Sequence, residues 1–165
     1  MGKYKKEIGK VNTVFVSRDG KGAIPKVIAK PIQTESPNRI VFGGSIKFSE
    51  DLKTHISENI IPQIDIILTV FDIPLYTYEL SVINLSAVSS SELKLTVSGF
   101  SLDLSVFLAI LSAGLKLPIR DDIVYTGHLA SSEGNIGQVD KLSEKCEAIL
   151  EDKNITTFVY PDIDN

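Results

Sequence analysis

The chain has 165 residues, of which 43% are hydrophobic and 23% charged, and its net charge is −4 at pH 7. These values are ordinary for a globular protein, so we expect residues 1–165 to form a single domain with its own core. The acidic balance argues against a general nucleic-acid binder, whose binding face should be basic. Cys146 is the only cysteine, which excludes an intrachain disulfide and fits a reducing, cytoplasmic location.

Two further features bear on location and on the extent of the chain. Residues 1–10 contain no apolar run of the kind that marks a signal peptide. The longest apolar helix that we predict, over 101–117, contains Asp103 and Lys116 and is shorter than the roughly 20 apolar residues of a membrane span. We therefore expect no membrane association. The short tail after the last predicted strand fits a domain excised from a longer chain.

The N-terminal half predicts strands around one long helix. Residues that are β-branched or alternate in polarity, bounded by turn signals, predict strands at 11–16, 24–32, 39–42 and 78–85, with the first two forming a hairpin. Ser49-Glu50-Asp51 is typical of a helix start. Apolar residues then recur every three or four positions from Leu52 to Phe71. Pro62 should kink or split this helix, and Asp72-Ile73-Pro74 should end it.

The C-terminal half adds two helices and three strands. We predict strands at 93–97, 123–127 and 157–160, a polar loop or hairpin at 131–137, and a last helix that carries Lys145 on its apolar face. The helix over 101–117 has an apolar stripe, which we expect to face the core: Leu104, Phe107, Leu108, Leu111 and Leu115. Because runs of strands are separated by single helices, the pattern predicts an α+β fold.

Several kinds of site are weakly supported. The two histidines and one cysteine show no short ligand spacing, so we expect no metal site, and we place His55 on the polar face of its helix. Gly43-Gly44 is not followed by the Gly-Lys-Ser/Thr ending of a phosphate-binding loop. A serine–histidine–acid triad would have to combine Ser101 and His128 with Asp122 or Glu133, and only their presence supports it.

Ser101 and Lys145 form the stronger combination. Ser101 lies where the chain turns into a helix, a place that suits a nucleophile and equally a helix cap. A lysine can act as the base for a serine if burial lowers its pKa, and Thr126 could orient the amine. Alternatively, Lys145 is a solvated lysine that pairs with Glu144 or Glu147.

Three segments, in this order, resemble the proteolytic domain of the Lon protease family: Gly99-Phe100-Ser101-Leu102-Asp103, Tyr125-Thr126-Gly127 and Leu142-Ser143-Glu144-Lys145. In that family a Gly-Pro-Ser-Ala-Gly box carries the nucleophile, a Thr-Gly pair ends a strand, and a lysine near a helix start is the base. The resemblance implies a Lon-type α+β fold, with mixed β-sheet layers packed with two to three main helices. It also implies peptide-bond hydrolysis through an acyl-enzyme, with Ser101 as nucleophile, Lys145 as base and Thr126 in support.

The resemblance also implies partners: a polypeptide substrate, a homo-oligomeric ring and an attached or separate ATPase module, the only route by which ATP would be involved. No other cofactor is expected. Phe100, Leu102 and Asp103 replace the family's proline, alanine and glycine, and His128 replaces a glutamate. Leu102 could crowd a substrate, and the Asp103 carboxylate would favour a charged lysine. The alternative function is therefore a Lon-like domain that no longer cleaves and serves as an assembly or protein-interaction module.

Overall fold

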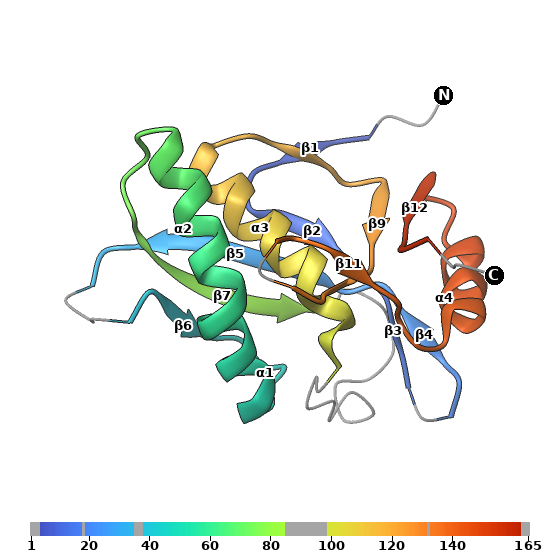
Figure 1. The fold of residues 1–165 in the computed structure, drawn as a ribbon. Helices are drawn as coiled ribbons and strands as arrows, with labels where there is room; N and C mark the ends of the chain where they lie inside the picture. Colours follow the sequence, from blue (N-terminus) through green and yellow to red (C-terminus); the bar gives the residue numbers. More distant parts are fainter. Residues whose placement is uncertain (1–3, 18, 35–37, 85–98, 132, 163–165) are drawn as a thin grey trace.

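The computed structural model describes residues 4–17, 19–34, 38–84, 99–131 and 133–162. The fold is α+β, with a mixed six-stranded sheet in the order β12-β9-β2-β5-β7-β6 (Figure 1). Its strands are β2 (Lys10–Asn12), β5 (Lys26–Ile32), β6 (Ile40–Phe42), β7 (Thr77–Ile83), β9 (Ile123–Tyr125) and β12 (Thr157–Val159). The predicted strand at 93–97 lies outside the described residues.

Three two-stranded antiparallel ladders accompany this sheet. They pair β1 (Lys6–Glu7) with β8 (Ile119–Arg120), β3 (Phe15–Val16) with β4 (Gly22–Ala23), and β10 (His128–Leu129) with β11 (Ile136–Gly137). Of the loop or hairpin predicted at 131–137, the last ladder shows the hairpin. The single strand predicted at 11–16 is wrong in detail, because β2 and β3 belong to different sheets and Thr13 between them donates its N–H to the Pro25 carbonyl.

The centre of the large sheet has one buried face. β7 runs antiparallel to β5 and parallel to β6. Alternate side chains of β7, those of Tyr78, Leu80 and Val82, are fully buried, as the two-residue period of a strand requires. The helices α2 and α3 cover this part of the sheet (Figure 1).

The long predicted helix is present and is divided. It consists of α1 (Glu50–His55), a π-helical segment η1 (Ile56–Ile60) and α2 (Ile61–Val70). The Ser49 hydroxyl caps α1 by accepting the Leu52 N–H at 3.2 Å. Pro62 lies in the first turn of α2, and because proline has no N–H to donate, the hydrogen-bond ladder widens just before it. The sequence predicted that Pro62 would kink or split this helix; helical structure instead continues without a gap from Glu50 to Val70, and only its hydrogen-bond pattern changes just before Pro62.

The described residues contain two more α-helices. A 3₁₀ turn, η2 (Phe100–Leu102), leads into α3 (Asp103–Leu115), and α4 (Leu142–Glu151) lies beside β12 at the other end of the molecule (Figure 1). A small second core of Val14, Val124 and Ile149 lies under α4. In the described parts of the chain, no helix is both long and apolar enough to cross a membrane.

The face that α3 presents to the core differs from the predicted one. Its fully buried apolar residues are Val106, Ala109 and Ile110, whereas the predicted leucine and phenylalanine stripe is only half-buried. Small residues on α3 allow this helix to lie close to α2 and to β7. A Cβ added to Gly114 would lie 2.8 Å from both the Leu68 side chain and the Tyr78 hydroxyl. The bulky residues are therefore displaced to the sides of the interface.

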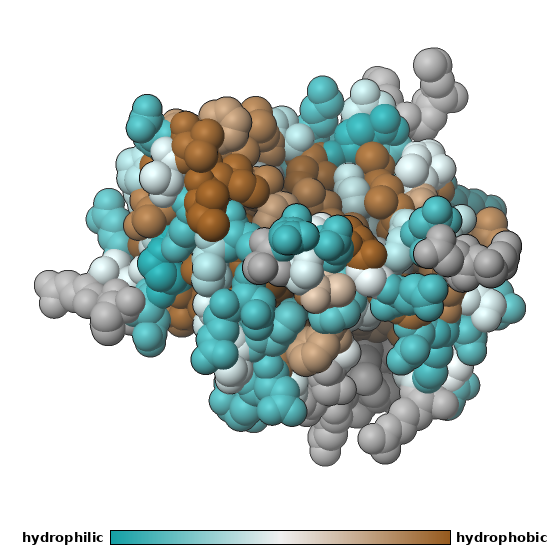
Figure 2. Space-filling view, in the orientation of Figure 1, coloured by the Kyte–Doolittle hydropathy of each residue, from teal (hydrophilic) through white to brown (hydrophobic). Residues whose placement is uncertain are grey.

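Figure 2 shows hydrophobic side chains gathered on the surface over α2 and α3. The described residues that carry this patch on α2 and just beyond it are Ile66, Val70 and Phe71, each more than half exposed. Contiguous exposed apolar surface of this kind is typical of interaction sites.

Candidate active site

Thr126 and Gly127 follow β9 in the chain, and their hydrogen bonds tie the start of α3 to the sheet. The Thr126 N–H donates to the Val159 carbonyl on β12 at 3.0 Å, and the side chain of Thr126 is fully buried. The Gly127 N–H donates to the Ser101 carbonyl at 3.0 Å, and the Leu104 N–H donates back to the Gly127 carbonyl at 3.1 Å. The Thr-Gly pair thus fixes the backbone of Ser101 against the sheet.

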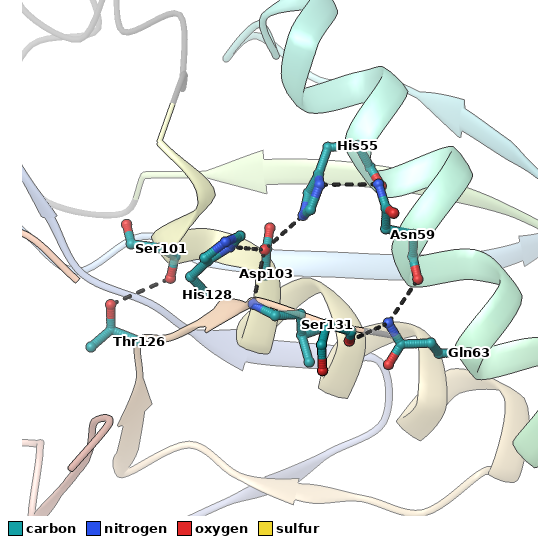
Figure 3. Close-up of polar contacts among 9 residues, drawn as sticks. His55, Asn59, Gln63, Ser101, Asp103, Thr126, His128 and Ser131 are labelled. Carbon is teal, nitrogen blue, oxygen red and sulfur yellow. Dashed lines mark hydrogen bonds and ion pairs between the residues drawn. The ribbon is translucent and has the colours of Figure 1, made fainter. Parts of the chain in front are cut away.

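Lys145 reaches the same place from the first turn of α4. Its side chain is 5% exposed. Its Nζ donates to Thr126 Oγ1 at 3.2 Å, and that hydroxyl in turn donates to the Ser101 carbonyl at 3.3 Å (Figure 3 draws the second bond). The structure therefore brings Ser101, Thr126 and Lys145 together, from three elements that are distant in sequence.

Burial changes the chemistry of the Lys145 amine. Loss of hydration lowers the pKa of Lys145 from its ordinary value of 10.5, and the nearby Asp140 carboxylate raises that pKa to a lesser degree. Among the described residues no carboxylate forms an ion pair with Lys145. Glu144, the partner in the solvated alternative, accepts a hydrogen bond from Ser143. Burial therefore favours the neutral form of the Lys145 amine more than water does.

Ser101 lies at the 3₁₀ turn before α3 and is half-buried. Its hydroxyl caps neither η2 nor α3, since neither has a side-chain cap hydrogen bond. Figure 3 shows the Ser101 side chain directed away from Asp103. Its Oγ has no hydrogen-bond partner in the described part of the chain, so Lys145 connects to Ser101 through Thr126 and not directly.

Asp103 contacts two histidines and forms no ion pair with Lys145 among the described residues. Its Oδ2 accepts hydrogen bonds from His55 Nε2 and His128 Nδ1, each at 2.8 Å, and from the Leu129 N–H at 3.0 Å (Figure 3). The expected effect of Asp103 on the lysine is absent, since the carboxylate that raises the pKa of Lys145 is that of Asp140. Leu102, expected to crowd a substrate, is fully buried.

His55 does not lie where the sequence analysis placed it. The prediction of a polar-face His55 is wrong, because its side chain is 13% exposed and faces Asp103. His128 also bonds Asp103, whereas Asp122 pairs with Arg120 and accepts from the Thr156 hydroxyl at 2.6 Å. The triad built on Asp122 is therefore not formed. Nothing in the local sequence links His55 to a residue 48 positions later.

Comparison of the sequence with protein-family models and with curated proteins gave no match. What the chain offers is its own geometry: a serine at a helix start, a buried lysine, and a threonine that contacts both.

Proposed function

We propose that this chain is a Lon-like serine peptidase domain that hydrolyses peptide bonds with a Ser101–Lys145 dyad. The observation that carries the proposal is the buried Lys145 amine, bonded to Thr126 and without an ion-pair partner among the described residues. Burying a lysine without a counter-charge costs folding free energy, so a purely structural role is a poor explanation for it. A lysine with a lowered pKa, connected through one threonine hydroxyl to the backbone of a serine, is instead suited to base catalysis once the two side chains meet.

The proposed reaction begins when Ser101 Oγ bonds to the carbonyl carbon of the scissile peptide and its proton passes to the Lys145 amine. Backbone N–H groups at the start of η2 and α3 would stabilise the oxyanion. The Lys145 ammonium then gives that proton to the leaving amine as the C–N bond breaks. Water attacks the resulting ester, again with Lys145 as base, and Ser101 regains its proton. A change of the Ser101 rotamer or the lysine conformation must first bring the two side chains into direct contact.

Partners form part of the same proposal. The substrate is an unstructured polypeptide, and the working form is a homo-oligomeric ring served by an ATPase module in the parent protein or a partner. The exposed apolar residues Ile66, Val70 and Phe71 support an assembly, since they leave a contiguous apolar surface uncovered.

The test is cleavage of an unfolded polypeptide by the wild type and by single variants. Ser101→Ala and Lys145→Ala should each lower the rate by roughly a thousandfold or more. Ser143→Ala and Lys153→Ala, which change exposed residues of the same types, should cleave normally. Labelling with a fluorophosphonate, followed by peptide mass spectrometry, should place the adduct on Ser101. Equal cleavage by wild type and Ser101→Ala would contradict the proposal.

A second candidate is a Lon-like domain that no longer cleaves and acts as an assembly or interaction module. One observation favours it: the Ser101 hydroxyl has no hydrogen bond to Lys145. Absence of both cleavage and Ser101 labelling in the wild-type protein would support this candidate over the peptidase.

A further inference from the structure

We propose that His55, Asp103 and His128 form a binding site for a divalent transition-metal ion. The three side chains come from α1, the start of α3 and β10, and they converge in Figure 3. One donor atom from each residue lies within 4.8 Å of the other two. Both ring nitrogens already lie 2.8 Å from Asp103 Oδ2. A zinc ion at about 2.0–2.1 Å from each ligand requires only small shifts from such spacing.

The charge of Asp103 supports this inference independently. The side chain is 0% exposed, and its Oδ1 is buried without any hydrogen-bond partner. No lysine or arginine pairs with it among the described residues. Neutral histidines can donate hydrogen bonds, but they leave the negative charge in place, and an uncompensated buried carboxylate is costly. A bound cation would neutralise that charge and would give Oδ1 a partner as a ligand atom.

The three ligands suit a metal ion of intermediate hardness and leave at least one of its coordination positions free. Two imidazoles and one carboxylate favour Zn²⁺ or its first-row neighbours over Mg²⁺ and Ca²⁺, which prefer oxygen ligands. The His128 side chain is 32% exposed and so can be reached from solvent, whereas His55 is 13% exposed. The Phe100 ring lies against both imidazoles, with centroids 4.3 Å from His55 and 5.4 Å from His128, and so holds their orientation.

A second layer of contacts holds His55. Its Nδ1 lies 3.2 Å from the side-chain amide of Asn59, a residue of the π-helical segment. Gln63 Nε2 donates to the backbone carbonyl of Asn59 at 2.9 Å (Figure 3). In the structure the Asn59 amide faces His55 Nδ1 and donates to the His55 carbonyl, so Nε2 carries the proton that it gives to Asp103. Metal binding at Nε2 would move that proton to Nδ1 and would require the Asn59 amide to rotate so that its oxygen accepts it. Helical π-turns recur at functional sites, and this one begins directly after His55.

The test uses the full chain without a histidine tag, freed of metal with a chelator. Titration with ZnCl₂ should show one bound ion, and titration with CoCl₂ should produce visible absorption from a low-symmetry site. Loss of outer-layer contacts alone weakens metal sites by about 10–100-fold, so loss of a direct ligand in His128→Gln or Asp103→Asn should weaken zinc binding by about 100-fold or more. Zinc should raise the melting temperature of the wild type and of neither variant.

Matched controls make the outcome decisive. Cys146→Ser removes the only thiol, and Asp51→Asn removes an exposed carboxylate; both variants should bind zinc as the wild type does. His128→Gln changes a partly exposed residue, so it serves if Asp103→Asn fails to fold. Zinc binding by His128→Gln as tight as that of the wild type, or no binding by the folded wild type, would overturn the proposal and leave Asp103 as a hydrogen-bond acceptor for two imidazoles.

Discussion

The single hydroxyl of Thr126 acts both as a hydrogen-bond acceptor and as a donor. The oxygen accepts from the Lys145 amine, and the hydrogen points to the Ser101 carbonyl. In the proposed mechanism this single group holds the base at the backbone of the nucleophile until a substrate arrives. Thr126 is thus a positioning residue, and its effect must pass through Lys145.

Thr126→Val keeps the shape of the side chain and removes the hydroxyl. We expect a loss of about 1–3 kcal/mol in the free energy of unfolding, because a buried amine loses its acceptor. Cleavage should fall in parallel. Thr126→Ser, which restores the hydroxyl, should recover most of both losses. Urea unfolding and the peptidase assay measure the two effects. A Thr126→Ser variant as impaired as Thr126→Val would show that the methyl group matters and the hydroxyl does not.

If the proposed peptidase activity is present, Asp140 should tune its pH dependence. Its carboxylate raises the pKa of Lys145, opposing the larger effect of burial. Only the neutral amine accepts a proton, so cleavage should increase as the pH rises through the pKa of Lys145. Asp140→Asn removes the opposing charge, lowers that pKa further, and should shift the midpoint of a plot of kcat/KM against pH to lower pH. Glu147→Gln, an exposed acid on α4, should leave the midpoint unchanged. A shift to higher pH would contradict the assignment of Lys145 as base.

At the scale of elements, α3 shows which part of an apolar pattern is informative. Its position was predicted to within two residues, but its buried face was not. Leucines indicate that a helix packs against something. The smallest residues mark the closest contact, because the backbones can approach there. Ala109, Ala113 and Gly114 are the small residues that mark the buried face of α3. A prediction based only on the large apolar residues overlooks them.

The two faces of α3 should differ in energy. Ile110→Ala removes a fully buried side chain and should cost about 2–5 kcal/mol, whereas Leu108→Ala, on the half-buried face, should cost less. Leu150→Ala on α4, at 84% exposure, is the surface control and should change stability by no more than about 0.5 kcal/mol. Chemical denaturation of the three variants gives the comparison. Equal costs at positions 108 and 110 would restore the predicted stripe as the core face.

For the whole molecule, sequence patterns predicted the features that depend on neighbouring residues in the chain. The helix start at Ser49 and the interruption of the helix near Pro62 follow from residues a few positions apart. The α+β class follows from the order of the predicted strands and helices, and the structure has it as well. The cluster around Asp103 depends on chain segments brought together only by folding, so no spacing in the sequence indicated it. Ser101, Thr126 and Lys145 were singled out by their residue types and positions and then supported by a resemblance; their proximity is a property of the fold, and their activity remains a prediction.

The C-terminal strand is held to the rest of the sheet by a polar connection that should control stability in acid. Asp122 bonds Arg120 and the Thr156 hydroxyl, which precedes β12, and these contacts lower the pKa of Asp122 from 3.8 to about 2. An acid whose pKa is depressed in the folded state contributes stability above its unfolded pKa and loses it as the pH falls toward the folded value. Wild-type stability should therefore drop between about pH 4 and pH 2, the window between the two values.

Asp122→Asn should be less stable than the wild type at neutral pH and should lose less on acidification through that window. Glu58→Gln, which changes an exposed acid with no ion pair among the described residues, should follow the wild-type curve. Urea midpoints measured from pH 5 downward provide the comparison. Parallel wild-type and Asp122→Asn curves would mean that β12 is held by its parallel pairing with β9 and by the small core under α4, since those contacts do not titrate.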